Sequence, residues 1–459
     1  MRLIVKLAKG LAAAVVVAVA GGLAWLAVFP PELLRIGDGY AAKIVCSNVF
    51  IAGRDAQKVL GEDVQAPGNP LLRLIRVSVD RDQGTVTARV LGLFAPGYAL
   101  YRGELGCVSV PDGDLTAARN AAPAPDATKA VAGEEPWPEG DRVELDRQGR
   151  IAALVADQSL AGPGMRAIVV VHDGRIIAEN YGEGFSADTP LLGWSMTKTV
   201  NAAVIGRLMQ EGRMSFDDAN LLPLWEWDAR ARIRLSDLLS MESGLAFNEN
   251  YGTVADVTRM LYLEPDMASL PENAPLEAQP GARFRYSSGT AILLARIWMN
   301  RLKDESTALA YPHEALFAPL GMTSAVLEAD ERGTFVGSSY LYATARDWAR
   351  FGLFLLQDGV WNGKRLLPEG FVGAMRTPTQ ASNGRFTQVQ AWLAGPGGSS
   401  SAQTGLPEDT FWLQGHDGQS VAIVPSAGLV VVRLGLTPLR QGYRPQALLK
   451  EIVAAVAAP

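Results

Sequence analysis

A serine and a lysine lie three positions apart in the stretch GWSMTKTVNAAVIGRLMQEGRM. Val200, Val204 and Leu208 follow at four-residue spacing, which predicts an amphipathic helix that begins next to Ser195. Residues at i and i+3 share a helix face, so the ammonium of Lys198 can lie beside the hydroxyl of Ser195. A lysine desolvated near a helix N-terminus has a lowered pKa and can take the proton of a serine. The spacing therefore fits nucleophilic catalysis, with Ser195 as nucleophile and Lys198 as base.

The alternative is that Ser195 only caps a structural helix, because serine is a favoured N-cap residue. A capping box would place Glu or Gln three residues after the cap. This chain has Lys198 there, a cation in the turn where the helix dipole opposes positive charge. S-x-x-K also occurs often by chance, so the choice between cap and nucleophile depends on the rest of the chain.

Two further polar stretches lie beside predicted elements. In ARFRYSSGTAILLARI, the residues Tyr286, Ser287 and Ser288 come just before a second amphipathic helix. In WLQGHDGQSVAIV, the tripeptide His416-Asp417-Gly418 comes at the start of an apolar β-strand. The chain has no G-x-S-x-G elbow, P-loop, H-E-x-x-H or Rossmann fingerprint, which disfavours several other enzyme classes.

Together with Ser195 and Lys198, these ordered motifs resemble the serine β-lactamase and penicillin-binding-protein superfamily over roughly residues 160–440. The chain looks closest to its class C and esterase branch, and more narrowly it resembles 6-aminohexanoate-dimer hydrolases. This resemblance implies a β-lactamase/transpeptidase-like α+β fold, an α/β sandwich in which helices cover an antiparallel sheet, with an all-helical subdomain. It also decides the earlier choice in favour of Ser195 as a nucleophile.

The resemblance implies roles for individual residues. Tyr286 corresponds to the tyrosine that carries the proton to the leaving group, and an adjacent ammonium is expected to favour its phenolate. The oxyanion hole corresponds to the backbone N–H groups of Ser195 and Gln419, and Gly418 lets the substrate lie close to the strand edge.

Four positions depart from the family pattern or extend it. Ser288 stands where many β-lactamases have asparagine, and His416 stands where they have lysine. Asp417 further disfavours an anion-binding pocket, so we expect poor β-lactam recognition. Tyr251 resembles the loop tyrosine that closes over amide substrates in nylon-oligomer hydrolases, with an exposed loop tyrosine as the alternative.

The N-terminus predicts membrane association. Residues 11–29 are uncharged and apolar, and the basic residues Arg2, Lys6 and Lys9 precede them. We expect a single-pass inner-membrane anchor with the rest of the chain periplasmic or otherwise extracytoplasmic. The alternative is a signal peptide removed at an A-x-A site, with secretion to the periplasm.

Cys46 and Cys107 are the only cysteines in the chain. An oxidising compartment would join them, so we expect a disulfide, with two buried free thiols as the alternative. The chain has no Cys/His cluster and three histidines, so no metal is expected, and the resemblance implies no organic cofactor.

The order of elements predicts three parts in the 459 residues: an anchor or signal at 1–35, a small segment at 36–140, and the hydrolase domain at 141–459. Alternating runs predict hairpins at 74–93 and 165–182, and residues 421–436 predict two strands joined by a turn. Residues 111–140 are rich in Ala, Pro and charge, and are expected to form a linker. Strands at both ends of the domain predict one antiparallel sheet.

We therefore expect an exported serine hydrolase that cleaves amide or ester bonds of small molecules or short peptides. A penicillin-recognising D-amino-acid peptidase acting on cell-wall peptides is one alternative, and a catalytically idle, membrane-tethered binding protein is another. The net charge of −6 and the absence of a long basic run argue against nucleic acid as a partner. The sequence predicts no particular oligomeric state.

Overall fold

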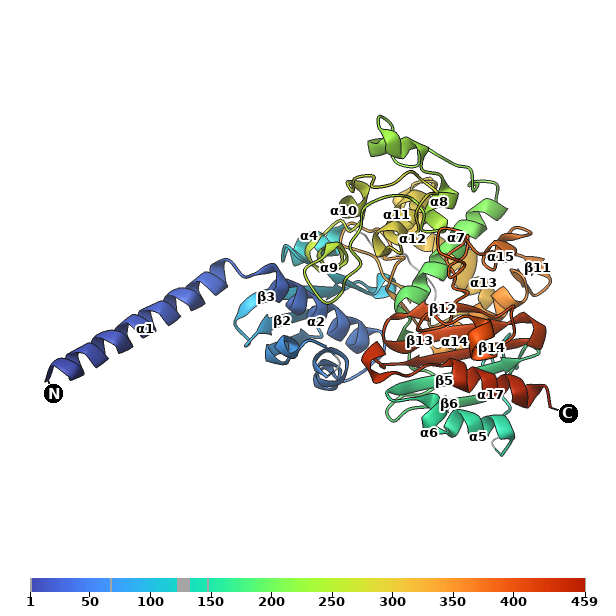
Figure 1. Cartoon of the computed structure of the whole chain (residues 1–459), viewed down its shortest axis with the longest axis horizontal. Coiled ribbons are helices and arrows are strands. Elements are labelled where there is room, and N and C mark those ends of the chain that lie inside the picture. Colours follow the sequence, from blue (N-terminus) through green and yellow to red (C-terminus); the bar gives the residue numbers. More distant parts are fainter. Residues whose placement is uncertain (1, 67, 122–132, 147, 459) are drawn as a thin grey trace.

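The computed structural model describes residues 2–66, 68–121, 133–146 and 148–458 (Figure 1). Helix α1 (Arg2–Val28) projects away from the rest of the molecule. Its segment Lys9–Val28 is long and apolar enough to cross a membrane and is not buried against any other part of the chain. The structure thus contains the apolar N-terminal helix that the sequence predicts.

A five-stranded antiparallel sheet forms the centre of residues 141–459, in the order β12-β13-β14-β5-β6. These residues are called the hydrolase part below, after the domain that the sequence predicts there. Its strands, in chain order, are β5 (Met165–His172), β6 (Arg175–Tyr181), β12 (Phe411–Gly415), β13 (Gln419–Val424) and β14 (Leu429–Gly435). Strand β14 pairs with β5, so the two ends of the domain meet in one sheet, and the hairpin at 165–182 and the strands at 421–436 are confirmed.

Helices cover both faces of this sheet. Successive apolar side chains of β5 point to opposite faces, so each face needs a cover. Ile168 and Val170 pack with the short helices α5 (Arg150–Ala156) and α6 (Gln158–Ala161) and with α17 (Gln446–Val456). Val169 and Val171 point to the other face and join the main core, where α14 (Ala345–Leu356) packs on the sheet. The predicted α+β class, with an antiparallel sheet covered by helices, is confirmed.

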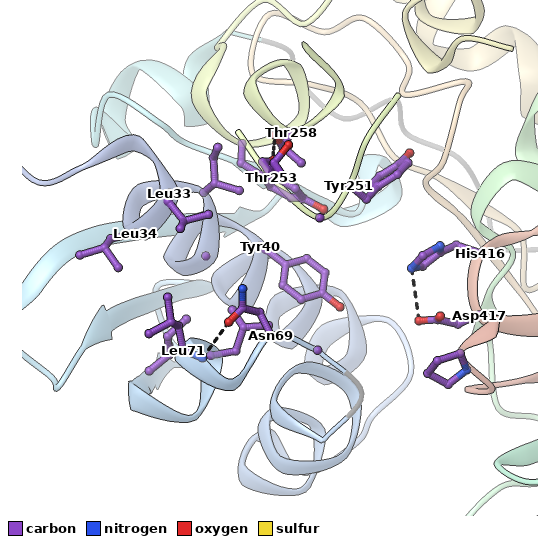
Figure 2. A pocket seen from close by; sticks show the side chains of 18 of the residues that line it. Leu33, Leu34, Tyr40, Asn69, Leu71, Tyr251, Thr253, Thr258, His416 and Asp417 are labelled. Carbon is purple, nitrogen blue, oxygen red and sulfur yellow. Dashed lines mark hydrogen bonds and ion pairs between the residues drawn. The ribbon is translucent and has the colours of Figure 1, made fainter. Parts of the chain in front are cut away.

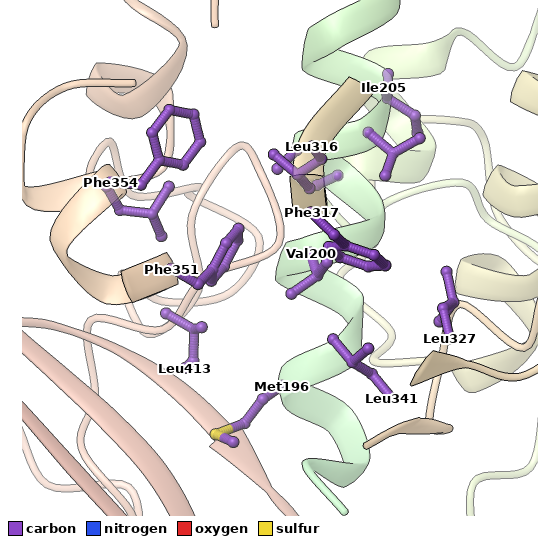
Figure 3. Close-up of a cluster of buried hydrophobic side chains, with 14 of the residues drawn as sticks. Met196, Val200, Ile205, Leu316, Phe317, Leu327, Leu341, Phe351, Phe354 and Leu413 are labelled. Atoms are coloured by element: carbon purple, nitrogen blue, oxygen red, sulfur yellow. The ribbon is translucent and has the colours of Figure 1, made fainter. Parts of the chain in front are cut away.

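Helix α7 (Thr197–Gln210) runs through the main core, with most of its side chains buried. Figure 3 shows its Val200 and Ile205 among phenylalanines of α14 and of the π-helical turn η7 (His313–Phe317). The helices beyond it form a largely helical region: α8 (Leu235–Leu239), α9 (Asp256–Leu263), α10 (Ser269–Glu272), α11 (Ser288–Met299), α12 (Glu305–Pro312) and α13 (Ala318–Leu320). This burial fixes the position of the residues at the start of α7.

Three smaller sets of elements complete the hydrolase part. Strands β7 (Leu191–Leu192), β8 (Val326–Leu327) and β9 (Leu341–Ala343) form a three-stranded antiparallel sheet beside α7. Strands β10 (Val360–Trp361) and β11 (Lys364–Arg365) form a hairpin. Two short helices, α15 (Phe371–Ala374) and α16 (Ser401–Thr404), follow them.

Residues 32–110, called the N-terminal unit below, pack helix α2 (Glu32–Phe50) on a four-stranded antiparallel sheet. The strands are β1 (Ile75–Asp80), β2 (Thr85–Val90), β3 (Phe94–Tyr101) and β4 (Cys107–Ser109). The hairpin expected at 74–93 is β1 and β2, and the structure adds β3 and β4 to it. Between α2 and β1 lie α3 (Ala56–Val59) and the turns η1 (Leu60–Gln65) and η2 (Pro70–Leu74).

The segment expected to be a linker contains a short helix, α4 (Leu115–Asn120), that packs beside β3. Residues 122–132 of that segment lie outside the described residues.

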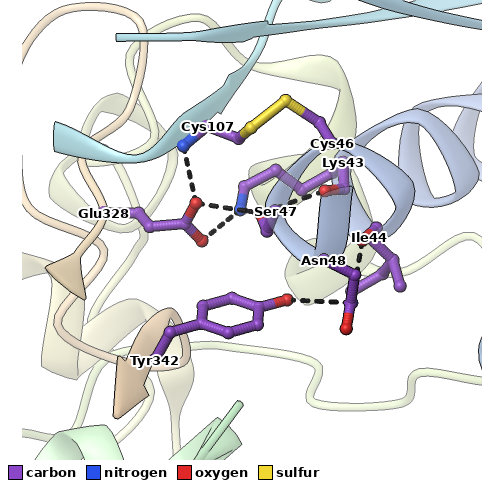
Figure 4. The surroundings of a disulfide bond; sticks show 8 residues. All are labelled: Lys43, Ile44, Cys46, Ser47, Asn48, Cys107, Glu328 and Tyr342. Atoms are coloured by element: carbon purple, nitrogen blue, oxygen red, sulfur yellow. Dashed lines mark hydrogen bonds and ion pairs between the residues drawn. A yellow bond between two sulfur atoms is a disulfide. The ribbon is translucent and has the colours of Figure 1, made fainter. Parts of the chain in front are cut away.

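A buried ion pair joins the N-terminal unit to the hydrolase part, beside a disulfide that lies within the N-terminal unit (Figure 4). Glu328, next to β8, accepts hydrogen bonds from the Cys107 backbone N–H at 2.6 Å, from Ser47 Oγ at 2.8 Å and from Lys43 Nζ. Cys46 and Cys107 form the expected disulfide, with their Cα atoms 6.0 Å apart. A buried carboxylate is stable only when it is paired and hydrogen-bonded, so the two parts depend on each other.

Candidate active site

Ser195 lies in a single 3-10 turn, η4 (Trp194–Met196), that leads directly into α7. Trp194 has φ 48°, a left-handed conformation that a tryptophan rarely adopts. A Cβ atom at Gly193 would lie 2.1 Å from the ring of Trp348, so only glycine fits before this turn. Strained backbone next to a reactive residue is a common property of functional sites.

Lys198 is buried in the first turn of α7, and its Nζ donates three hydrogen bonds. The acceptors are Ser195 Oγ at 3.0 Å, Ser288 Oγ at 3.1 Å and the carbonyl of Ser338 at 2.9 Å. Burial lowers the pKa of Lys198 to about 8, although the nearby carboxylate of Glu249 raises it. A substantial fraction of this amine is therefore neutral near pH 8, and its partner is the Ser195 hydroxyl.

Ser288, the first residue of α11, connects Lys198 to the carboxylate of Glu249. Glu249 accepts hydrogen bonds from Ser288 Oγ at 2.5 Å and from the Ser288 backbone N–H at 2.8 Å. The Tyr251 hydroxyl lies 3.2 Å from the same Oγ. Because Ser288 gives its only proton to Glu249, its oxygen accepts from both Lys198 and Tyr251. Ser288 is thus a link in a polar chain that ends at a carboxylate.

Tyr286 lies within the same cluster but does not have the electrostatics expected from the sequence. Its ring centroid is 4.9 Å from Lys198 Nζ, and it packs against Phe386 and Trp392. Burial raises the pKa of Tyr286, the Glu249 carboxylate raises it further, and a hydrogen bond with Ser195 lowers it only in part. Burial therefore opposes the phenolate that the sequence predicts, and Tyr286 is a neutral phenol near pH 7.

The His416-Asp417-Gly418 tripeptide forms the turn between β12 and β13 rather than the start of a strand. Gly418 has φ 89°, and its carbonyl accepts a hydrogen bond from Arg433 at 3.1 Å. Gln419 begins β13 opposite Gly415, and its buried side-chain amide bonds to both the N–H and the carbonyl of Gly435. The side chain of Gln419 thus holds the hairpin, while its backbone N–H remains the candidate oxyanion donor.

Three aromatic rings separate the polar cluster from a cavity on the other side. Tyr251 stacks on His416 with centroids 5.5 Å apart, and Trp194 meets His416 edge to face at 5.6 Å. His416 Nε2 lies 3.4 Å from Asp417 Oδ2. Tyr251 is therefore partly buried over the site, with its hydroxyl in the polar cluster and its ring on the cavity wall.

The cavity has a volume of about 410 Å³ and lies between the N-terminal unit and the hydrolase part (Figure 2). Helix α2 contributes Leu34 and Tyr40 to its wall, while the hydrolase part contributes Trp194, Tyr251 and His416. The N-terminal unit thus forms one wall of a cavity whose other wall includes Trp194, the residue before the candidate nucleophile. Among the residues that the structure describes, no group of three or more His, Cys, Asp or Glu side chains could hold a metal ion.

The structure places most of the residues that the sequence singled out close together. It adds two groups to them, one side-chain carboxylate and one backbone carbonyl. Ser195, Lys198, Tyr286, Ser288 and Tyr251 form one cluster, with Gln419 on the neighbouring hairpin. Glu249 was not identified from the sequence, although it lies two residues from Tyr251. Its acidic side chain in that loop was the one feature of the sequence that could have indicated a role. The Ser338 carbonyl was also missed, because a backbone acceptor has no signature in sequence.

Comparisons with known proteins show the family and the fold. A family model described as Beta-lactamase matches residues 150–445. The 6-aminohexanoate-dimer hydrolase of Paenarthrobacter ureafaciens is 26% identical over 295 residues, which cover 59% of this chain and 72% of that protein.

Solved structures share the fold. One from Bacillus anthracis, described as a candidate 6-aminohexanoate-dimer hydrolase, has a TM-score of 0.56 at 22% identity, and the match covers 72% of this chain and 89% of that one. A penicillin-binding-protein homologue from Caulobacter crescentus has a TM-score of 0.52 at 16% identity, covering 68% and 99%. The architecture is therefore the β-lactamase/transpeptidase fold.

Proposed function

Because the chain belongs to the beta-lactamase family, we propose that it is a serine hydrolase that cleaves an amide or ester bond through an acyl-enzyme on Ser195. One observation carries this proposal. The buried amine of Lys198, with a pKa of about 8, lies 3.0 Å from the Ser195 hydroxyl. A base with a pKa near the working pH and within hydrogen-bond reach of a hydroxyl is what nucleophile activation requires.

Acylation begins when neutral Lys198 takes the Ser195 proton and Oγ attacks the substrate carbonyl. The negative charge that forms on the carbonyl oxygen is accepted by the backbone N–H groups of Ser195 and Gln419. Tyr286, as a neutral phenol, donates its proton to the leaving group and is reprotonated from the Lys198 ammonium. Water then hydrolyses the ester on Ser195 by the reverse proton path.

The polar chain from Lys198 through Ser288 to Glu249 supports this scheme. The carboxylate accepts from Ser288, so the Ser288 oxygen stays oriented toward the Lys198 Nζ. Together with the Ser338 carbonyl, these contacts hold the amine against Ser195. A preorganised base needs no rearrangement when the substrate arrives.

The test is covalent labelling of the full-length protein with a fluorophosphonate, followed by hydrolysis assays on p-nitrophenyl esters, nitrocefin and aminohexanoate oligomers. We expect labelling and ester or amide turnover in the wild type, and neither in Ser195→Ala. A folded wild-type protein that is neither labelled nor active would refute the proposal. Stable acylation by a labelled penicillin would instead favour action on cell-wall peptides.

We also propose that α1 anchors the chain in the inner membrane, with the catalytic part outside the cytoplasm. The apolar helix, its basic flank and the Cys46–Cys107 disulfide support this topology, because disulfides persist in oxidising compartments. A reporter enzyme that is active only in the periplasm, fused after residue 140, should be active. Loss of that activity with a folded reporter in the cytoplasm would contradict the topology.

A further inference from the structure

We infer that the cavity between the N-terminal unit and the hydrolase part binds the acyl chain of a membrane-resident amphiphile. The scissile ester or amide of that amphiphile would lie at Ser195. This inference rests on the proposed hydrolase activity and names its substrate class. It concerns the substrate's aliphatic portion, which the polar cluster does not contact.

The cavity wall is mostly apolar, and its aliphatic side chains lie mainly on the N-terminal unit. Leu34, Ile36, Leu72, Ile75 and Val90 line it, all from the N-terminal unit. Burial of each methylene in such a site is favourable, so an alkyl chain gains affinity with every carbon that enters. A wall of this kind, with a few polar groups at one end, fits an amphiphile better than a polar peptide.

The polar groups lie at the end nearest the candidate nucleophile. Figure 2 shows Leu33, Leu34 and Leu71 on one side of the cavity and His416 and Asp417 on the opposite side. Trp194, which also lines the cavity, directly precedes Ser195 in the chain. A chain that enters from the leucine side therefore points its head toward the rings of Trp194, Tyr251 and His416, which border the catalytic cluster.

The mouth of the cavity carries exposed leucines, called the leucine rim. Leu33, Leu71 and Leu439 line the cavity and are 39%, 46% and 71% exposed. Leu74 and Leu91 extend the rim, and the Leu91 backbone N–H donates to the Leu74 carbonyl at 2.8 Å. Exposed large aliphatic side chains grouped in this way mark an interaction surface.

The position and charge of the rim identify a lipid surface as its partner. The candidate span ends at Val28, five residues before Leu33, so the mouth lies within about 18 Å of the end of the membrane helix. The turn η2 that carries Leu71 has no buried residue, and exposed Arg73 and Arg76 accompany its leucines. Leucines that enter the interface beside arginines that attract anionic headgroups are typical of membrane-contacting segments.

The first test uses the full-length protein in lipid nanodiscs and p-nitrophenyl esters of four to twelve carbons below their micelle concentration. We expect kcat/KM to rise by up to about fourfold for each methylene until the chain fills the cavity. Gly37→Phe would fill the cavity, because a Cβ at Gly37 points toward Leu72 and Ile75 at 3.4 and 3.6 Å without a clash. It should lower the ratio of twelve-carbon to four-carbon kcat/KM at least about tenfold.

The matched control is Gly61→Phe, in the same unit at an exposed position with open space around its Cβ. It should leave the chain-length ratio unchanged. A wild type that shows no preference for longer chains, or a ratio that falls equally in both variants, would overturn the inference while leaving the hydrolase activity in place.

The second test does not depend on turnover. A dodecanoate ester with a diazirine in its chain is photocrosslinked to the Ser195→Ala protein in nanodiscs, and the modified residues are mapped by mass spectrometry. We expect crosslinks to residues 33–37 and 71–75, which disappear with Gly37→Phe. Crosslinks confined to α1 would overturn the inference. Cavity crosslinks together with an inactive wild type would refute the proposed activity alone.

Discussion

Replacing Glu249 by glutamine should shift the pH dependence of catalysis while keeping Ser195, Lys198 and Tyr286 in the protein. Lys198 acts as a base only when it is neutral, so kcat/KM should fall as the pH drops below its pKa of about 8. The Glu249 carboxylate raises that pKa by stabilising the ammonium. Removing the negative charge should therefore lower the pKa and move the acid limb of the profile to lower pH.

The expected size of this pH shift follows from the distance between the two charges, which two hydrogen bonds limit. Glu249 Oε1 lies 2.5 Å from Ser288 Oγ, which lies 3.1 Å from Lys198 Nζ, so the charges are within about 5.6 Å. Coulomb's law gives roughly 3 kcal/mol at an effective dielectric constant of 20 and roughly 0.7 kcal/mol at 80. The acid limb should therefore move down by between about 0.5 and 2 pH units.

The assay is the pH profile of kcat/KM for a short p-nitrophenyl ester, measured for the wild type, Glu249→Gln and Glu277→Gln. Glu277 is ion-paired with Arg285 at 2.5 Å and does not contribute to the Lys198 pKa, so its variant is a matched control. The position of the limb is compared, not the height of the plateau. An acid limb in Glu249→Gln that stays in place or moves to higher pH would refute the assigned base and its charge coupling.

Three further predictions concern the catalytic base, the backbone before the nucleophile and the disulfide. Lys198→Ala should lower the rate by about 10²–10⁴-fold in a protein that still folds, and a near-wild-type rate in the ester assay would contradict its role as base. Gly193→Ala should fold poorly or lose thermal stability, because its methyl group would overlap the neighbouring tryptophan ring, and an unchanged melting temperature would argue against this packing. Replacing Cys46 and Cys107 by alanine should lower the free energy of unfolding by up to about 4 kcal/mol, since 61 positions separate them, and identical urea midpoints would refute this.

Short sequence patterns predicted individual helices and hairpins, because these elements depend on neighbouring residues. The helix after Ser195 follows from the spacing of Val200, Val204 and Leu208, and the hairpin at 165–182 follows from its Asp173-Gly174 turn. The pKa of Tyr286 was expected to be lowered because the sequence shows a nearby lysine. It does not show the Phe386 and Trp392 rings that exclude water from the phenol.

Contacts between distant segments could not be predicted in the same way. The Ser338 carbonyl reaches Lys198 across 140 positions, and Glu328 reaches Cys107 across 221. Neither contact has a periodicity or a motif, because each depends on how the three-stranded sheet and the N-terminal unit pack in space. The cavity wall formed by α2 was unforeseen for the same reason.

The Glu328 cluster bears on how this enzyme should be produced in the laboratory. The family match begins at residue 150, which invites expression of that portion alone. Such a fragment would retain Ser195 and Lys198. It would also leave the Glu328 carboxylate without its lysine, serine and amide partners, in the segment that leads to Ser338. Removal of one partner from a buried ion pair typically destabilises a protein by about 3–5 kcal/mol. A soluble version should instead begin at residue 30 or 31, after the apolar helix, and be made where disulfides can form.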